Sequence, residues 1–221
     1  MKITRRLLIP TLSFTALVIL VLLSIQTWLE ARRLTQTEQD ALTTLQAIFD
    51  GRLQAEEDFA VALALEAANN PDIQAAFAAR DRETLTSLTL PAYEQLDARF
   101  GISQYQYHLP PATSFLRLHQ LDRFGDDLSS FRQTVMQANA NQEIVSGLEV
   151  GRGGMGVRGV VPVFFQGEHI GTVEIGANVD QILLDALKED YNADWQIFLR
   201  RDLAELAVEG FVGTTPGPIP E

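Results

Sequence analysis

The segment GLEVGRGGMGVRGVVPVFFQGEHIGTVEIG, residues 147–176, contains three runs rich in valine, isoleucine and phenylalanine. Two glycine-containing connections, GRGGMG and QGEH, separate these runs. Alternating apolar runs joined by glycine-rich turns are typical of β-hairpins. Together with the residues just before it, the segment therefore predicts three consecutive antiparallel strands, at residues 143–152, 156–165 and 169–176.

Two more strands are predicted upstream, at residues 102–108 and 114–119, where ISQYQYH and SFLRLH flank a turn that contains HLPP. The sequence FGDDLSSFRQTVMQANANQ, residues 124–142, predicts a helix that is entered through Asp126 or Asp127, because aspartate is a preferred N-cap residue. These elements predict a sheet with a helix inserted between its second and third strands.

The C-terminal part of the chain predicts an amphipathic helix at residues 179–192 and a further strand at 194–200. The tail GTTPGPIPE, residues 213–221, has the proline- and glycine-rich composition of a linker or a disordered segment. Taken together, the pattern predicts an α+β fold, in which helices pack on an antiparallel sheet of about five strands.

The N-terminus has the pattern of a membrane anchor. Lys2, Arg5 and Arg6 precede a run of uncharged, mostly apolar residues from 7 to 29. As a helix, such a run is long enough to cross a hydrocarbon core of about 30 Å, and its basic flank favours a cytoplasmic N-terminus. No A-x-A-like cleavage site follows, so residues 1–29 are predicted to be an uncleaved transmembrane signal anchor.

A long helix is predicted to follow the anchor without a break, because residues 29–68 contain no proline and are rich in good helix formers. Apolar residues recur on one helical stripe, at positions Leu34, Ala41, Leu45, Ile48, Ala55, Phe59 and Ala62. One compact domain cannot cover the early half of a helix about 60 Å long. We therefore expect this stalk to pair with the stalk of a second copy in a homodimer.

Two shorter helices are predicted after the stalk. The pair Asn70–Pro71 marks a turn that places proline at a first helical position. Asp81 is the expected N-cap of the next helix, and Gly101 is its expected C-terminal stop. Because Pro91 lies inside this helix, we expect a kink or break near it.

Composition excludes several classes of protein. The 221 residues include no cysteine, which excludes a disulfide scaffold, a thiolate zinc site and an attached c-type haem. The formal net charge of -12 is unlike that of a nucleic-acid binder, which shows a basic face. No catalytic or phosphate-binding motif is present and the three histidines lack metal-ligand spacing, so no enzyme activity, cofactor or metal is expected.

Strand alternation divides the predicted sheet into two faces. The apolar face, which is expected to pack on the stalk helix, consists of Leu116, Leu118, Leu148, Val150, Val157, Val161, Val163, Phe165, Val173 and Ile175. The other face consists of Phe115, Arg117, His119, Glu149, Arg158, Val160, Pro162, Phe164, Thr172 and Glu174. Its charged residues either neutralise one another as partly buried ion pairs or line a polar cavity under the connecting loops, and the sequence leaves both alternatives open.

The segments HLPPATSFLRLH, FGDDLSSFR and GLEVGRGGMGVRGVVPVFFQGEHIGTVEIG, preceded by NNPDIQAAFAARDRETL, resemble the extracytoplasmic Cache sensor domains of bacterial receptors. The most similar type is the double Cache domain of methyl-accepting chemotaxis proteins and related transducers. The resemblance covers residues 30–200. It rests on the order and spacing of these segments and on their attachment to a signal anchor.

This resemblance implies a long N-terminal helix beside a PAS-like antiparallel sheet, with a small-molecule site on the side of the sheet away from that helix. It also implies a dimer that passes a signal through the membrane. Arginine and aromatic residues often hold carboxylate or amino-acid ligands in this family. The candidate ligand-binding residues are therefore Tyr105, Tyr107, Phe115, Arg117, His119, Glu149, Arg158, Phe164 and Glu174.

Three regions are expected: a cytoplasmic tip and anchor at 1–29, a Cache-type sensor at 30–190, and the start of a truncated second module or a linker at 191–221. The expected function is periplasmic ligand sensing from a single-pass anchor in a bacterial inner membrane, with the cytoplasmic signalling output absent from this chain. The alternative is a membrane-anchored scaffold or assembly protein whose sheet binds a protein partner.

The polar face also predicts the chemistry of the ligand. Arg117 or Arg158 is expected to grip a carboxylate in bidentate fashion. Glu149 or Glu174 would then meet an ammonium group, which favours an amino acid or another zwitterion over a simple dicarboxylate. If these four residues pair with one another instead, the cavity has to be formed by other residues.

Overall fold

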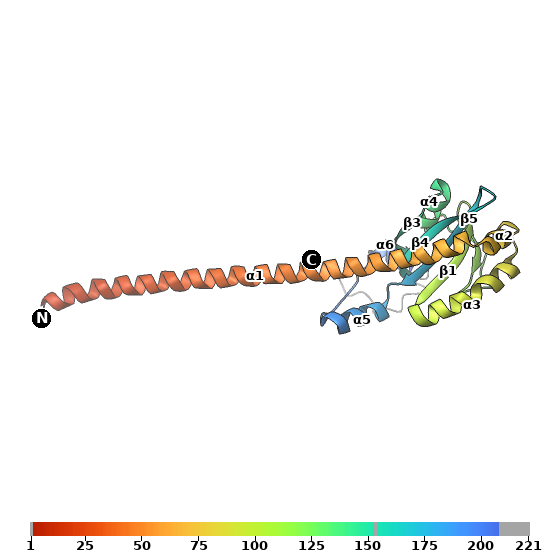
Figure 1. Ribbon diagram of the computed structural model, residues 1–221. Helices are drawn as coiled ribbons and strands as arrows, with labels where there is room; N and C mark the ends of the chain where they lie inside the picture. Colours follow the sequence, from red (N-terminus) through yellow and green to blue (C-terminus); the bar gives the residue numbers. More distant parts are fainter. Residues whose placement is uncertain (1, 153, 208–221) are drawn as a thin grey trace. The chain divides into compact units, whose positions relative to one another are not determined.

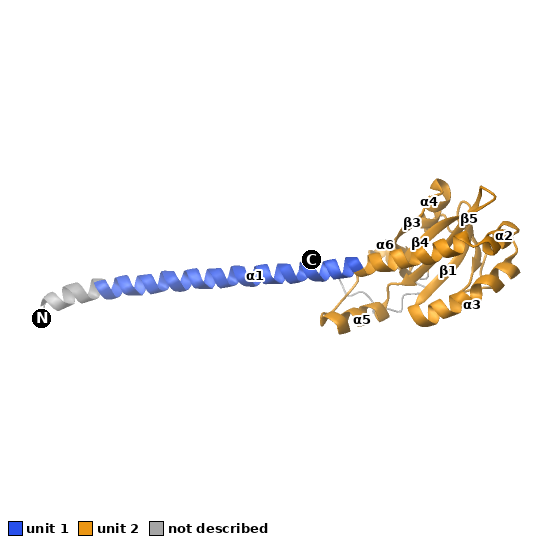
Figure 2. Ribbon diagram, viewed as in Figure 1, with its two compact units in different colours: residues 1–51 blue, residues 52–221 orange. Residues whose placement is uncertain are grey.

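The structure, a computed structural model, describes residues 2–152 and 154–207. The chain divides into two compact units, residues 1–51 and 52–221, which Figure 2 shows in different colours. Helix α1, Lys2–Asn69, contributes to both units, and the unit boundary falls at Gly51. The second unit contains every other helix and strand and has an α+β architecture, as the sequence predicts (Figure 1).

The first unit consists of the N-terminal part of α1. Among the described residues, α1 is the one helix that is long and apolar enough to cross a membrane, judged by length and composition. Its apolar side chains between residues 12 and 29 are exposed to the surroundings rather than packed within the protein. These features agree with the predicted anchor.

The second unit is built on a five-stranded antiparallel sheet with the strand order β2-β1-β5-β4-β3. Its strands are β1 Ile102–Leu109, β2 Thr113–Arg117, β3 Val145–Gly151, β4 Gly154–Phe165 and β5 Glu168–Asn178. The predicted number of strands and their antiparallel pairing are confirmed. The predicted second strand is too long, since β2 ends at Arg117, two residues before His119.

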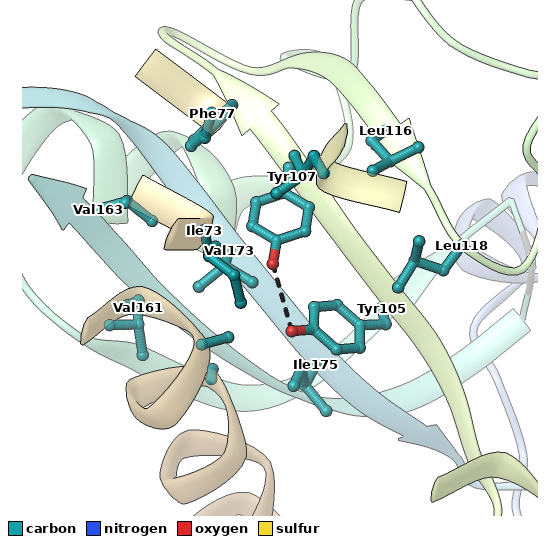
Figure 3. Close-up of a cluster of buried hydrophobic side chains, with 14 of the residues drawn as sticks. Ile73, Phe77, Tyr105, Tyr107, Leu116, Leu118, Val161, Val163, Val173 and Ile175 are labelled. Carbon is teal, nitrogen blue, oxygen red and sulfur yellow. Dashed lines mark hydrogen bonds between the residues drawn. The ribbon is translucent and has the colours of Figure 1, made fainter. Parts of the chain in front are cut away.

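One face of the sheet is covered by the C-terminal part of α1, by α2 Pro71–Ala78 and by α3 Arg82–Phe100. Figure 3 shows the core between these layers, where Tyr105 and Tyr107 lie among Val161, Val173 and Ile175. The helix approaches β4 so closely that a Cβ atom added at Gly159 would lie 2.6 Å from the Val61 nitrogen. This close approach fixes α1 against the sheet within the second unit.

The predicted helical stripe of the stalk is displaced from the real contact face. The buried side chains of α1 are Ala60, Ala64, Ala67 and Ala68, whereas the predicted positions Ala55 and Ala62 are exposed. Small residues occupy the contact face because the helix backbone lies so close to the sheet. Of the predicted stripe, Phe59 alone packs against this core.

The caps of the short helices are as predicted. The Asn70 side chain accepts hydrogen bonds at the start of α2, and that of Asp81 does so from Thr84 at the start of α3. Gly101 ends α3 in the left-handed conformation, at φ 68°. Of the predicted kink or break near Pro91, the break is wrong, because α3 continues through this residue.

The other face of the sheet is covered by α4, Gln133–Asn141, and by the irregular segment 118–132. Val160 packs there against Leu128, Val135 and Ala138. The predicted helix at 124–142 is therefore wrong over its first half. Asp126 binds Arg117 and Asp127 accepts the Ser129 backbone N–H, so both aspartates hold the irregular segment instead of capping a helix.

The C-terminal part contains α5, Gln181–Tyr191, as predicted, and α6, Arg201–Leu206, which the sequence analysis did not predict. The strand predicted at 194–200 is wrong, since this segment pairs with no strand. Its alternation is real, because Ile197 and Leu199 pack near Met155 and Val157. The predicted linker at 213–221 lies outside the described residues.

Candidate functional site

Strand register brings polar side chains from four strands together on the face opposite α1. In one cross-strand row Arg117 of β2 pairs with Gln106 of β1, which pairs with Glu174 of β5. In the next row Gln104 and Arg158 both lie opposite Gly176 of β5. Because side chains alternate along each strand, these residues share one face.

Glu174 is the centre of a buried charge network. Its side chain is fully buried, and one of its oxygens accepts a 2.5 Å hydrogen bond from Arg132. His108 Nε2 lies 3.7 Å from this same oxygen, Oε2, and Arg158 Nε lies 3.6 Å from the other oxygen, Oε1. Although burial alone would raise the pKa of Glu174, the nearby arginines outweigh it and lower this pKa to about 2.

Arg132 links this network to the edge of the sheet. It lies just before α4, and its Nε donates to Glu149 at 2.7 Å while its Nη2 donates to Glu174. Glu149 also accepts from the backbone N–H and the hydroxyl of Thr134, which is in the first turn of α4. The arginine, which is 5% exposed, therefore holds α4 against strands β3 and β5.

Arg117 holds the irregular segment over the sheet. It donates two parallel hydrogen bonds to Asp126, at 2.7 and 2.9 Å, and a third to the Arg123 backbone carbonyl. Bidentate arginine–carboxylate pairs combine strength with a fixed geometry. The segment consequently forms a wall of a cavity rather than lying flat on the sheet.

The cavity between the sheet and this segment measures about 340 Å³. It is lined by Ser103, Gln104, Gln106, Arg117, His119, Gln120, Arg123, Asp126, Leu128, Phe131, Arg132, Gly151, Arg152, Arg158 and Asn178. Five of these residues are arginines and one is an acid. When Glu149 and Glu174, which are bonded to Arg132, are counted as well, the arginines still exceed the acids by two. The cavity therefore favours an anion, although the chain as a whole is acidic.

Several polar atoms of the cavity lining have no hydrogen-bond partner. In the described part of the chain, Ser103 Oγ, Gln106 Oε1, His119 Nδ1, Arg158 Nη1 and Asn178 Oδ1 are all buried and unpaired. Buried polar groups in proteins are normally hydrogen-bonded, to the protein itself, to water or to a ligand. Their concentration around one cavity indicates a place where a polar molecule binds.

Arg158 occupies a space left free by two glycines on neighbouring strands. A Cβ atom at Gly156 would lie 2.7 Å from the Arg158 guanidinium, and one at Gly176 would lie 2.8 Å from it. Arg158 is 2% exposed, and burial lowers its pKa to about 10, which leaves it charged at neutral pH. The sequence thus places a permanent cation on the floor of the cavity.

The structure brings together some of the sequence-predicted residues and separates others. Arg117, His119, and Arg158 line the cavity, with Glu149 and Glu174 behind Arg132. The two alternatives for this face therefore coexist, since ion pairs support the wall and the floor of a cavity. The amino-acid hypothesis loses its basis, because both glutamates are already engaged by arginines.

Four predicted residues lie elsewhere. Tyr105 and Tyr107 point to the opposite face, where their hydroxyls are 3.2 Å apart in the core against α1 (Figure 3). Phe115 packs on Phe77 of α2, with the ring centroids 5.3 Å apart. Phe164 lies beyond a register shift in β4, where it is 38% exposed. The two tyrosines are wrong because regular alternation in β1 puts them on the apolar face, opposite Gln104 and Gln106. Phe115 and Phe164 are wrong because an edge strand and a register shift alter simple alternation.

Sequence reasoning missed Gln104, Gln106, Arg132 and Asn178. Alternation applied to β1 would have found the two glutamines, since they alternate with the two tyrosines. Arg132 gave no such signal, because it lies outside the strands and its partners are 17 and 42 residues away.

A five-stranded antiparallel sheet, with α1, α2 and α3 on one face and a polar cavity on the other, is a PAS-like architecture. The comparisons with known proteins agree with this architecture. A family model described as "Double sensory domain of two-component sensor kinase" matches residues 37–213. The chain therefore belongs to this double Cache family, which is a sensory, ligand-binding family rather than a catalytic one.

Several solved sensor domains are similar to this chain. The sensor domain of the histidine kinase DctB from V. cholerae matches with a TM-score of 0.53 and 14% identity, over 72% of this chain and 60% of that one. The ligand-binding domain of the C. jejuni chemoreceptor Tlp3, in complex with L-valine, matches with a TM-score of 0.47 and 13% identity, over 68% and 61%. No curated protein matches the chain.

The E. coli DcuS sensor domain matches with a TM-score of 0.47 and 16% identity, over 64% of this chain and 98% of that one. The chain spans about 60% of the length of the DctB and Tlp3 domains. At 14% identity, the likeness to the DctB sensor domain concerns the fold alone.

Proposed function

We propose that this chain is the input module of a transmembrane signal transducer and that its cavity binds a small organic acid. The single observation that carries the proposal is Arg158, a buried guanidinium with an unpaired Nη1 on the cavity floor. A cation that is buried and only partly neutralised is costly unless an anion completes its environment. A carboxylate is the planar acceptor that guanidinium groups bind best.

The cavity is also suited in size and access to a small molecule. Its volume of about 340 Å³ lies at the lower end of the range for ligand pockets, roughly 300–1,000 Å³. Seven of its fifteen lining residues belong to the irregular segment 118–132. Arg117 and Arg132 tie this segment to the sheet, together with backbone hydrogen bonds between Ser114 and residues 125 and 126. Binding of an acid at Arg158 would therefore bear on the same network that positions α4.

The proposed signal leaves the module through α1. The helix packs on the other face of the same sheet, with Ala60, Ala64 and Ala67 in the shared core. We place the N-terminus in the cytoplasm, the apolar part of α1 in a bacterial inner membrane and the sensor module in the periplasm. The stalk part of α1 would pair with that of a second copy, and either a histidine kinase or a chemotaxis output fits this scheme.

A thermal-shift comparison of oppositely charged molecules tests the proposal. The full chain in detergent micelles is heated with succinate, propionate, or 1,4-diaminobutane, which has the carbon skeleton of succinate with cationic ends. A ligand at 100 times its dissociation constant should add about 2.7 kcal/mol of stability. We expect an acid to raise the melting temperature and the diamine to leave it unchanged. If no acid raises the melting temperature, the proposal fails and the alternative, a membrane-anchored scaffold protein, is favoured.

A further inference from the structure

The amide of Gln106 gives the cavity a second recognition group. Gln106 lies in β1, lines the cavity and is 2% exposed. Its Nε2 donates to Gln104 Oε1 at 2.7 Å and lies 3.4 Å from Glu174 Oε1. The ionised Glu174 carboxylate can only accept, so a flipped Gln106 amide would place oxygen against oxygen at this neighbour. The orientation is therefore fixed, with Gln106 Oε1 as a buried acceptor that has no partner in the described residues.

The side chains of Gln106 and Arg158 both approach Glu174 and both line the cavity. Gln106 Nε2 and Arg158 Nε lie 3.4 and 3.6 Å from the same oxygen, Glu174 Oε1, so these nitrogens are within about 7.0 Å of each other. One small molecule can reach both side chains. It would need an acid group for Arg158 and, close to that group, a hydrogen-bond donor for Gln106.

The charge of the cavity decides between the two common donors, ammonium and hydroxyl. Every acid at the cavity is already engaged, Asp126 by Arg117 and both Glu149 and Glu174 by Arg132. An ammonium group would therefore enter a space with surplus positive charge and no free carboxylate. A hydroxyl satisfies the same acceptor without adding charge.

We propose that the cavity selects a hydroxy acid, in which a carboxylate held by Arg158 has a neighbouring hydroxyl that donates to Gln106 Oε1. This proposal rests on the proposed function and makes Gln106 the residue that determines specificity. A site built to bind a hydroxyl rejects the analogue without it, because the buried acceptor is then left unpaired. The amino acid of the same skeleton is rejected by charge instead.

Calorimetric titration of the full chain in detergent micelles, with two matched sets of acids, tests this selection. One set is lactate, alanine and propionate. The other set is malate, aspartate and succinate, whose two carboxylates match the cavity's surplus of two positive charges. In the set that binds, we expect the hydroxy acid to bind roughly tenfold tighter than the unsubstituted acid, and tighter still than the amino acid.

The substitution Gln106→Met removes the acceptor with little change of shape. It should erase the preference for the hydroxyl while the affinity for propionate or succinate stays within about twofold. The matched control Gln137→Met, at an exposed position of α4, should keep the preference. The ranking of the acids by the unaltered chain decides the proposal even if the Gln106 variant does not fold.

The possible results separate the two proposals. If acids bind but the hydroxy acid has no advantage, or if the amino acid binds best, the hydroxy-acid proposal is overturned and the organic-acid function stands. A preference that persists in a folded Gln106→Met variant also overturns it. If none of the six acids binds, the organic-acid function itself fails.

Discussion

The substitution Glu174→Gln removes the charge at the centre of the buried network and keeps the shape of the side chain. Glu174 is fully buried, and the guanidinium groups of Arg132 and Arg158 lower its pKa from 4.5 to about 2. A shift of this size corresponds to about 3 kcal/mol in favour of the charged form. Breaking a buried ion pair by removing one partner costs a similar amount, about 3–5 kcal/mol.

We therefore expect Glu174→Gln to lower the free energy of unfolding by about 3 kcal/mol. Urea denaturation of the chain in detergent micelles measures this loss, followed by near-ultraviolet circular dichroism, to which the buried Tyr105 and Tyr107 contribute. Glu168→Gln is the matched control, because Glu168 is an exposed residue of the same strand, and it should change the stability by less than about 0.5 kcal/mol. A loss below about 1 kcal/mol for Glu174→Gln would refute the reasoning, since the network could not then depend on this charge.

Three further predictions concern stability. Burial lowers the pKa values of His108 and His119 to about 4, so the unfolded state binds more protons between pH 6.5 and 4. The free energy of unfolding should therefore fall as the pH drops through this window, by up to about 3 kcal/mol for the fully buried His108. The substitution His108→Asn should make the free energy of unfolding depend less on pH. Gly159→Ala should cost about 1–3 kcal/mol in urea denaturation because its Cβ would meet the α1 backbone, whereas Gly51→Ala, in open space within the helix, should not destabilise. Asp81→Ala should lower the melting temperature by removing the cap of α3, and an unchanged melting temperature would contradict that role.

The parts of the fold that local signals determine could be predicted from the sequence. Glycine-rich turns and alternation predict the β3–β4–β5 meander, and proline, aspartate and glycine predict the ends of α2 and α3. The failures occur where a distant partner overrides a local preference. Asp126 is a good N-cap residue by type, but its bidentate bond with Arg117 keeps the segment around it out of a helix.

The candidate site shows the same division. Arg158 and Glu174 could be predicted because alternation is regular in the parts of β4 and β5 that contain them. Arg132 could not, because it acquires its role only when α4 folds back onto the sheet. The predicted ligand also changes, from an amino acid to a hydroxy acid, because of Arg132. Judged from the sequence, Glu149 and Glu174 are free to meet an ammonium group, and only the structure shows that Arg132 engages both.

The central claim, that Arg158 holds the carboxylate of a small acid, is tested most directly by one calorimetric comparison. The acid that binds the unaltered chain best is titrated into the Arg158→Met variant and into Arg99→Met, in which an exposed arginine of α3 is replaced. We expect Arg158→Met to remain folded, because Arg132 still pairs with Glu174, and to lose at least tenfold in affinity, whereas Arg99→Met binds as the unaltered chain does. An Arg158→Met variant that is folded and binds the acid with unchanged affinity would contradict the account.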